Sequence, residues 1–271
     1  MKHTAKNTIK NVIAIIPARL VSIRLPNKLL LPLADKPLIL WTVEQAKKAR
    51  NVSRVIVATD SEEILRIVED GGGEAVLTDK NHKSGSDRIA EAAEKLPENS
   101  IIVNVQGDEP LISPTTIEKA VDAILQDDSI QMATTCEPIH DIKDVLSADV
   151  VKVVSDENDF ALYFSRSPIP FPREAVRKHG TLENALHEEK DLLSLYRKHT
   201  GLYVYQREFL LKYTRLKQSN SEKTEMLEQL RALENGAKIK VVEVAENSIG
   251  VDTKEDFERV REILENRKSQ I

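Results

Sequence analysis

Cysteine is nearly absent from this chain of 271 residues, and its scarcity excludes two kinds of site. The single residue Cys136 permits neither an intramolecular disulfide nor a CxxC metal site. The short run that contains it is flanked by apolar residues, which favours a buried structural thiol over a catalytic one.

Long hydrophobic runs are missing as well. After Lys2, Lys6 and Lys10, the apolar run Val12–Ile16 ends at Pro17. This run is too short for the hydrophobic region of a signal peptide, and no segment long enough to span a membrane follows it. We therefore expect a cytoplasmic protein with no membrane partner.

The chain also lacks the broad positive field of a typical nucleic-acid-binding protein. It has 39 Lys and Arg against 44 Asp and Glu, which gives a net charge of −5. Apolar residues make up 41% and charged residues 31%, values typical of a globular domain. We expect no nucleic-acid partner.

Neither glycine-rich phosphate motif occurs, because no G-x-G-x-x-G follows a strand and no G-x-x-x-x-G-K-[ST] is present. A phosphate site would have to be built from side chains. The loop after the first strand carries Arg19, Arg24 and Lys28, and Pro17 and Pro26 stiffen it. Guanidinium and ammonium groups suit a polyphosphate, although a solvated loop with ordinary surface cations is the alternative.

The first half alternates apolar, β-branched runs with amphipathic stretches, which predicts a mostly parallel sheet covered by helices on both faces. Strands are expected at Val12–Ile16, Arg54–Thr59, Glu74–Leu77, Ile101–Val105 and Gln131–Thr135, and helices at Leu38–Arg50, Glu62–Glu69, Asp87–Lys95 and Pro114–Leu125. Ligands bind such sheets where the strands end in loops.

The second half is less regular, and we expect one domain over residues 1–271 with an inserted subregion at about 150–215. A hairpin is expected at Val150–Val154 and Ala161–Phe164, non-regular chain at Pro168–Pro172, a surface helix near Leu192–Tyr196, strands at Gly201–Tyr205 and Lys238–Val244, and helices at Glu225–Asn235 and Thr253–Lys268. Thr253 and Asp256 are spaced as a capping box.

Two acidic residues follow predicted strands. Asp108 comes after the strand Ile101–Val105 in N-V-Q-G-D-E-P, and Asp252 stands before the last helix in S-I-G-V-D-T. A divalent cation that bridges phosphates is often held by one or two such carboxylates. Taken alone, Asp252 is better explained as a helix cap, and the second carboxylate is what favours a metal site.

Other polar groups admit two interpretations each. Ser84, Gly85, Asp87 and Arg88 lie in K-S-G-S-D-R before a helix, where a nucleotide could bind or Ser86 could simply cap the helix. In the middle subregion, Arg166 could clamp a substrate carboxylate, whereas His199 at a strand edge is more typical of a structural residue.

The motifs together carry a family resemblance. P-A-R-x-x-S-x-R-L-P-x-K, V-A-T-D, S-G-S-D-R, N-V-Q-G-D-E-P, Y-F-S-R-x-P-I-P, H-T-G-L-Y, L-E-Q-L-R and G-V-D-T follow one another from about Val12 to the C-terminus. This set closely resembles the 3-deoxy-manno-octulosonate (Kdo) cytidylyltransferases of lipopolysaccharide synthesis. The resemblance implies a nucleotide-diphospho-sugar transferase fold, a Rossmann-like three-layer α/β/α sandwich.

The resemblance also implies an activity and a site. The reaction would be CTP plus Kdo, an acidic eight-carbon sugar, giving CMP-Kdo and pyrophosphate in a Mg²⁺-dependent homodimer. The implied roles are phosphate binding by Arg19, Arg24 and Lys28; nucleotide seating by Ser84–Arg88 and Gln106; Mg²⁺ binding by Asp108 and Asp252; and sugar binding by Arg166, His199, Tyr203, Glu228 and Gln229.

Some positions depart from the family pattern. Asn27 stands where Gly is frequent, Thr200 stands where Ile follows the histidine, and the charged stretch 173–198 matches poorly. A hydroxyl at Thr200 leaves 8-amino-Kdo or another 2-keto-3-deoxy sugar acid open as the substrate. A sialic-acid-type cytidylyltransferase would carry a loop richer in glycine and lysine than Ser22–Asn27, and a non-catalytic nucleotide sensor would not need both carboxylates.

Overall fold

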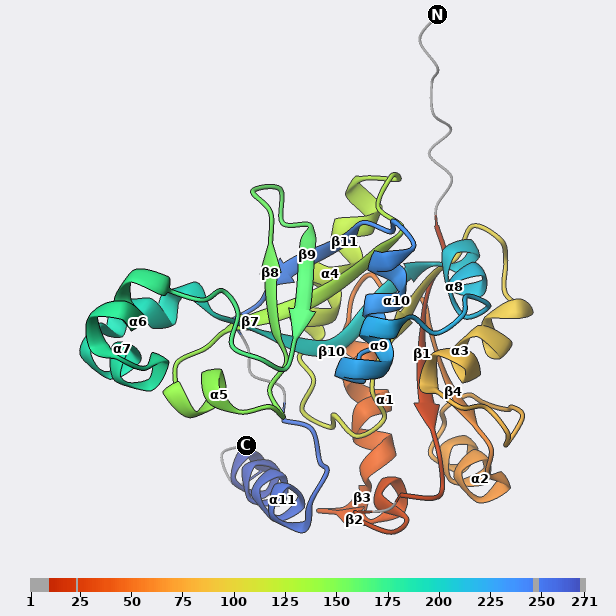
Figure 1. Ribbon diagram of the computed structural model, residues 1–271. Helices are drawn as coiled ribbons and strands as arrows, with labels where there is room; N and C mark the ends of the chain where they lie inside the picture. Colours follow the sequence, from red (N-terminus) through yellow and green to blue (C-terminus); the bar gives the residue numbers. More distant parts are fainter. Residues whose placement is uncertain (1–9, 23, 246–248, 269–271) are drawn as a thin grey trace, which may run out of the picture.

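The computed structural model describes residues 10–22, 24–245 and 249–268, and it shows a nine-stranded sheet between two layers of helices (Figure 1). The main strand order is β11-β7-β10-β6-β1-β4-β5, and the hairpin β8–β9 joins it through β10. The strands are β1 Val12–Ala18, β4 Arg54–Thr59, β5 Ala75–Leu77, β6 Ile101–Asn104, β7 Met132–Pro138, β8 Lys152–Ser155, β9 Ala161–Ser165, β10 Arg197–Gln206 and β11 Ile239–Glu243; β2 Pro32–Leu33 and β3 Lys36–Pro37 form a separate small ribbon.

The sheet is mostly parallel, as the alternation predicts. β1 pairs in parallel with β4 and with β6. β4 also pairs in parallel with β5, and β7 pairs in parallel with β11. β10 runs antiparallel between β6 and β7. The predicted α/β class is therefore confirmed, and the ends of β1 and β6 open toward one edge of the sheet.

Apolar residues of successive strand positions pack on opposite faces, which gives the sheet two cores. Ala14 and Ile16 pack with one layer, and Ile13 and Ile15 with the other. The first layer contains α1 Leu38–Lys48, α2 Glu62–Asp70, α4 Pro114–Gln126 and α11 Lys254–Lys268; the second contains α3 Gly85–Glu94, α8 Arg207–Tyr213 and α10 Gln229–Glu234. None of the described helices is long and apolar enough to cross a membrane.

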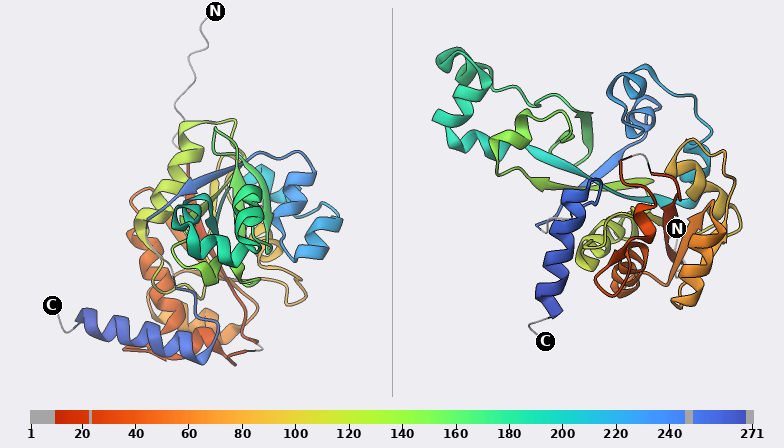
Figure 2. Two further views of the ribbon diagram at one scale, coloured as in Figure 1. Left: turned by 60° about the vertical axis from the view of Figure 1, so that its left-hand side comes forward. Right: turned by 90° about the horizontal axis from the view of Figure 1, so that it is seen from below.

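A lobe of short helices projects from one side of the sheet (Figure 2). It contains α5 Ile142–Leu146, α6 Arg173–His179, α7 Leu182–Glu188 and the 3₁₀ helix η2 Lys190–Leu195. Ile139, Val145, Leu186 and Tyr196 form its own small core. The division into one domain with an inserted subregion at about 150–215 remains a prediction.

The sequence prediction for this lobe was wrong in detail. A single helix near Leu192–Tyr196 is replaced by η2, and two further helices precede it. Gly180, at φ 85°, ends α6, and the hydroxyl of Thr181 caps α7. This Gly–Thr pair is an ordinary stop and start signal that the high charge of the stretch obscured.

The predicted helix Glu225–Asn235 is also broken. α9 Asn220–Glu225 ends at Met226, which adopts a left-handed conformation at φ 55°, and α10 begins at Gln229. Met is not a residue that favours positive φ, so the break could not be predicted from the residue type. Consequently Glu228 and Gln229 lie at a corner between two helices rather than inside one.

Candidate active site

The first strand delivers the basic loop to the edge of the sheet. β1 ends at Ala18, Arg19 follows it, and Lys28 begins the 3₁₀ helix η1 Lys28–Leu30. The Nη2 of Arg19 donates to the carbonyl of His82 at 3.0 Å. Lys28 is buried, with 8% of its surface exposed, whereas Arg24 reaches into solvent.

The two predicted metal ligands converge on Lys28. Its Nζ donates to Asp108 Oδ2 at 2.5 Å and to Asp252 Oδ1 at 3.0 Å, and Arg24 Nη2 lies 3.0 Å from Asp252 Oδ2. Burial acts to lower the pKa of Lys28, but the two carboxylates outweigh it and hold the pKa above its ordinary value. Four charged groups, two of each sign, therefore meet at one point.

Backbone contacts explain how two carboxylates so distant in sequence meet. The N–H of Val251 donates to the carbonyl of Asp108 at 2.8 Å, and Val251 is fully buried. A Cβ on Gly107 would lie 3.0 Å from the carbonyl oxygen of Pro17, so glycine lets this turn pack closely against the end of β1 without a shift of the backbone. The segments that carry Asp108 and Asp252 are thus held beside the basic loop by main-chain contacts.

The segment before α3 is held by its own cap. Ser84 caps the helix and forms a capping box with Asp87, so the suggested cap at Ser86 was wrong. Instead, Ser86 Oγ donates to Glu228 Oε2 at 2.7 Å across the cavity. Arg88 is completely buried and pairs with Asp60 Oδ2 at 2.8 Å, and this burial lowers its pKa.

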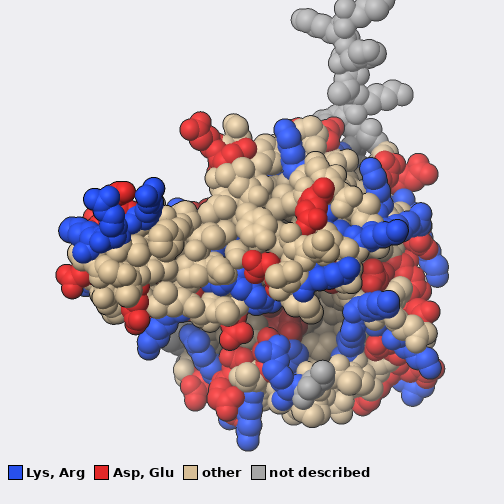
Figure 3. Space-filling model, in the orientation of Figure 1, with Lys and Arg blue, Asp and Glu red and all other residues tan. Residues whose placement is uncertain are grey.

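These residues surround one open cavity in two connected parts. The smaller part, about 260 Å³, is lined by Arg19 and Lys28, and the larger, about 840 Å³, extends toward β8 and β10. Gly85, Gln106 and Asp108 line both parts. On the face seen in Figure 3, side chains of both charges gather around a hollow below the β8–β9 hairpin.

The structure brings most of the predicted site residues to this cavity. The larger part is lined by all five predicted sugar-binding residues, Arg166, His199, Tyr203, Glu228 and Gln229, together with Asp252. Arg24, Ser84, Asp87 and Arg88 are not among the described residues that line the cavity. Ser84 and Asp87 form the cap of α3, Arg88 lies in a buried ion pair and Arg24 pairs with Asp252, so the nucleotide contacts of these four residues stay predictions.

We call the larger part, with the predicted sugar-binding residues, the sugar end, and the smaller part, with Arg19 and Lys28, the phosphate end. The sugar end is lined by aromatic rings as well as by side chains of both charges. His199 lies within β10 rather than at its edge, and its ring contacts Phe164 and Tyr203 at centroid distances of 5.0 and 5.3 Å. Burial lowers the pKa of His199 to about 3 and raises the pKa of Tyr203 well above 10. Both side chains are therefore neutral hydrogen-bonding groups near pH 7.

The neutral ring of His199 has an assignable tautomer. Thr134 Oγ1 donates to the carbonyl of Leu202 at 2.8 Å, so its oxygen accepts from His199 Nε2 at 3.0 Å. The Nδ1 atom of His199 is then left as an acceptor.

Asn104 and Lys198 also line the cavity, and the motif reading assigned them no role. Gln106 Nε2 donates to Asn104 Oδ1 at 3.0 Å and to the carbonyl of Gly201 at 3.3 Å. Asn104 is the first residue of the motif N-V-Q-G-D-E-P, and Lys198 directly precedes H-T-G-L-Y. The spacing of Asn104 and Gln106, two apart at the end of β6, was the available signal.

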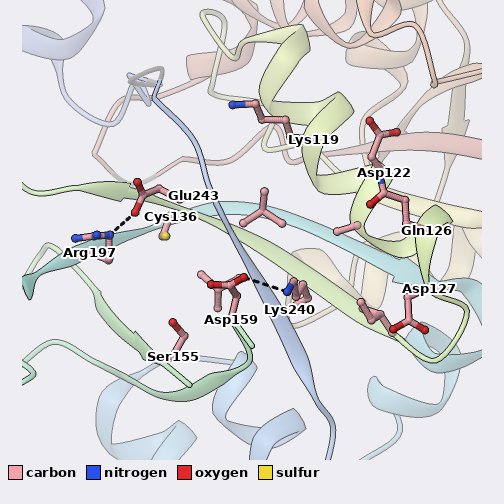
Figure 4. Close-up of a pocket in the computed structure, with 14 residues that line it drawn as sticks. Lys119, Asp122, Gln126, Asp127, Cys136, Ser155, Asp159, Arg197, Lys240 and Glu243 are labelled. Atoms are coloured by element: carbon pink, nitrogen blue, oxygen red, sulfur yellow. Dashed lines mark hydrogen bonds and ion pairs between the residues drawn. The ribbon is translucent and has the colours of Figure 1, made fainter. Parts of the chain in front are cut away.

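A second cavity lies at β11, the edge strand, and none of the predicted site residues lines it (Figure 4). Its volume is about 660 Å³, and Cys136 is in its wall. Burial raises the pKa of the Cys136 thiol to about 12, as expected for a buried thiol without catalytic activation. Four of the charged residues that line this cavity form two ion pairs, Arg197 with Glu243 and Lys240 with Asp159.

Comparisons with known proteins agree with this geometry. Residues 13–239 match the cytidylyltransferase family model. A 3-deoxy-manno-octulosonate cytidylyltransferase of Trichlorobacter lovleyi is 48% identical over 93% of this chain and 97% of its own length, and one of Geobacter sulfurreducens is 46% identical over 94% and 99%.

Solved structures give the same picture. A CMP:2-keto-3-deoxy-manno-octonic acid synthetase complexed with CTP superposes with a TM-score of 0.85 at 38% identity, covering 95% of this chain and all of that one. A 4-diphosphocytidyl-2C-methyl-D-erythritol synthase of Anaerococcus prevotii, at 15% identity and a TM-score of 0.61, shares the fold. The chain belongs to the cytidylyltransferase family, among the 3-deoxy-manno-octulosonate cytidylyltransferases, and is a nucleotidyltransferase.

Proposed function

We propose that this enzyme transfers CMP from CTP to the anomeric hydroxyl of Kdo and releases pyrophosphate, and that its product serves lipopolysaccharide synthesis. The names of its relatives support the substrates. The observation in the chain itself that carries the proposal is the meeting of Asp108 and Asp252 on Lys28, between the cationic loop and the larger part of the cavity.

The phosphate end of the cavity would hold CTP. Arg19, Arg24 and Lys28 present cations to an anion, and the two guanidinium groups can contact phosphate oxygens bidentately. Gly85 lies at the first turn of α3, where backbone N–H groups favour negative charge, and it lines both parts of the cavity. Gln106 would help to seat the nucleotide.

A magnesium ion fits the two carboxylates. Among the described residues, no group of three or more His, Cys, Asp or Glu side chains could hold a metal ion alone. Mg²⁺ commonly takes one or two protein carboxylates, with phosphate oxygens and water as its other ligands. Asp108 and Asp252 already enclose one cation, the ammonium of Lys28, so we propose that they hold Mg²⁺ once the triphosphate is bound.

The sugar end would bind the acid. Arg166 lines the cavity and can clamp the carboxylate, while His199, Tyr203, Glu228 and Gln229 offer hydrogen bonds to hydroxyl groups. Kdo would thus meet a cation for its carboxylate and several hydrogen-bonding groups for its hydroxyls. This combination favours a sugar acid over a neutral sugar.

In the reaction, the anomeric oxygen forms a bond to the α-phosphorus, the bond from that phosphorus to the pyrophosphate oxygen breaks, and the hydroxyl proton is lost to solvent. The residues position both substrates in line. Arg19 and Lys28 stabilise the negative charge that develops on the leaving pyrophosphate. When bound, Mg²⁺ would lower the pKa of the attacking hydroxyl and screen its approach to the phosphate.

One structural finding bears on the choice of sugar. The hydroxyl of Thr200 donates to the carbonyl of Thr135 at 3.1 Å, and Thr200 is absent from the described residues that line the cavity. The Thr200 hydroxyl, which left 8-amino-Kdo open as the substrate, is therefore hydrogen-bonded within the protein. This favours Kdo itself over the amino analogue.

We also propose that two copies of the chain associate and work in the cytoplasm, where the nucleotide substrate is found. β9 pairs only with β8 among the described strands, and large apolar side chains are exposed on it and on the adjoining lobe. Leu162 is 63%, Phe171 60% and Leu195 46% exposed. A second copy could cover them. Sedimentation velocity tests this, and a monomer at micromolar concentration would contradict it.

Product formation tests the proposed reaction. Purified protein is mixed with CTP, Mg²⁺ and a panel of sugar acids that includes Kdo, 8-amino-Kdo and a sialic acid, and pyrophosphate and CMP-sugar are followed by ³¹P NMR. We expect CMP-Kdo to form fastest. Faster turnover of another acid would change the substrate, and no product with any acid would favour a nucleotide sensor.

A further inference from the structure

Lys152 is a fully buried lysine at the start of β8, beneath the sugar end of the cavity. Its Nζ donates to three backbone carbonyls, those of Ser147 at 2.7 Å, Val150 at 2.7 Å and Arg166 at 2.6 Å. An ammonium group has three donors, so all of them are used. A neutral amine has only two, and the arrangement therefore requires the charged form even though burial lowers the pKa of Lys152.

These three bonds join two walls of the cavity. Val150 and Arg166 both line it, one just before β8 and the other just after β9. The β8–β9 hairpin holds its two strands together, but the residues just before β8 and just after β9 have no partners in its ladder. Lys152 connects these two ends to each other.

Glu225 holds the same arginine from the other side. Its Oε2 accepts from the N–H of Arg166 at 2.9 Å, and its Oε1 accepts from the hydroxyl of Ser165 at 2.6 Å. The backbone carbonyl of Glu225 accepts from Arg166 Nε at 2.7 Å. Glu225 is also the last residue of α9, so these bonds tie β9 to the corner that carries Glu228 and Gln229.

The guanidinium of Arg166 is left with donors to spare. Nε binds Glu225, and Nη1 binds the carbonyl of Ala148 at 3.0 Å. Of five N–H donors, two are engaged inside the protein, and three on the Nη atoms remain for a ligand. The main-chain N–H and carbonyl of Arg166 are both engaged as well, so its backbone cannot shift without breaking buried bonds.

We propose that Lys152 and Glu225 are positioning residues that orient Arg166 toward the carboxylate of the sugar acid. This inference rests on the proposed function. Neither residue touches the nucleotide end of the cavity, so both act on one substrate only. A fixed guanidinium loses less freedom when it binds a carboxylate than a mobile one does.

Two variants and a matched control test this role. Lys152→Met keeps the length of the chain and removes the three donors, and Glu225→Gln weakens the contacts of Arg166 with less disturbance. Lys143→Met, an exposed lysine on α5, is the control. We expect the KM for Kdo to rise about tenfold or more in both variants, with the KM for CTP within about twofold of the parent. The control should change neither.

A second measurement is independent of turnover. The Arg166 Nε–H resonance of the ligand-free protein, assigned by its loss in Arg166→Lys, should exchange slowly in the parent and faster in Lys152→Met and Glu225→Gln. If Lys152→Met does not fold, Glu225→Gln alone decides. An unchanged KM for Kdo, or equal increases for both substrates, overturns the inference. Slow exchange in a parent that makes no CMP-Kdo would reject the proposed function and leave the positioning role standing.

Discussion

The two ends of the cavity hold their charged groups in different ways. At the phosphate end, the side chains of Arg24 and Asp252 are 67% and 48% exposed and pair with each other near Lys28. At the sugar end, Arg166 is fixed by buried bonds, and His199 and Tyr203 are kept neutral by burial.

This difference matches the ligand that the proposed function assigns to each end. Exposed ion pairs are weak and exchange readily, so the cations can leave their carboxylates for a triphosphate. A sugar acid with a single charge offers less Coulomb attraction and gains more from groups that are already oriented. Under the proposed function, the nucleotide would be attracted mainly by charge, and the sugar would be selected by oriented groups.

The largest effect is expected where the two ends meet. Asp108→Asn removes one carboxylate from the shared point and should lower kcat by about 10² to 10³-fold, because charge stabilisation in the transition state is lost. Lys28 keeps Asp252 as a partner, so the fold should remain intact. Steady-state kinetics and circular dichroism check both. Asp70→Asn, on the exposed end of α2, is the control, and near-normal turnover in Asp108→Asn would reject the metal role.

Acid should lower the free energy of unfolding through His199 at the sugar end. The folded pKa of His199 is about 3, below the ordinary value of 6.5, so its stabilising contribution is complete above pH 6.5 and is lost as the pH falls toward 3. Between pH 7 and pH 5 this loss should be about 2 kcal/mol.

His199→Gln removes that titration and should be less sensitive to acid over the same range. Urea denaturation at the two pH values measures the difference in the free energy of unfolding. An identical pH dependence in parent and variant would mean that the ring is not buried in a neutral state.

Added salt should change substrate binding at the two ends to different extents. Arg24→Met is expected to raise the KM for CTP about tenfold, and added salt should raise the KM for CTP more than the KM for Kdo, because exposed charges are screened. Arg66→Met, an exposed arginine on α2, serves as the control. Equal salt effects on the two substrates would remove the distinction between the ends.

The smallest effect is expected at the second cavity. With a thiol pKa of about 12, Cys136 should react negligibly with iodoacetamide at pH 7.5, and activity should be unchanged. Mass spectrometry of the treated protein measures the modification. Rapid alkylation would show that the edge at β11 opens in solution.

The phosphate end could largely be predicted from the sequence. Parallel strands end at one edge of a sheet, so charged residues after β1 and β6 were expected to meet there. Arg19, Lys28 and Asp108 follow this rule. Asp252 stands just before α11 rather than directly after a strand. Its motif was therefore the main indication that it belongs with them.

The sugar end could be predicted only through the family motifs. Met226 breaks a helix without a glycine, so the corner that carries Glu228 has no signature in composition or periodicity. Lys152 sits in an apolar strand where a lysine suggests an exposed position, yet its three carbonyl partners come from loops. Arg88 is a motif residue expected at the nucleotide, and its buried ion pair with Asp60 could not be foreseen from the motif.

The separation of the two ends is tested most directly by one set of kinetic constants. KM values for CTP and for Kdo are measured in the parent, in Arg24→Met and in Arg166→Met. We expect Arg24→Met to raise mainly the KM for CTP and Arg166→Met to raise mainly the KM for Kdo. If either variant raises both KM values by the same factor, the cavity does not recognise its two substrates at separate ends.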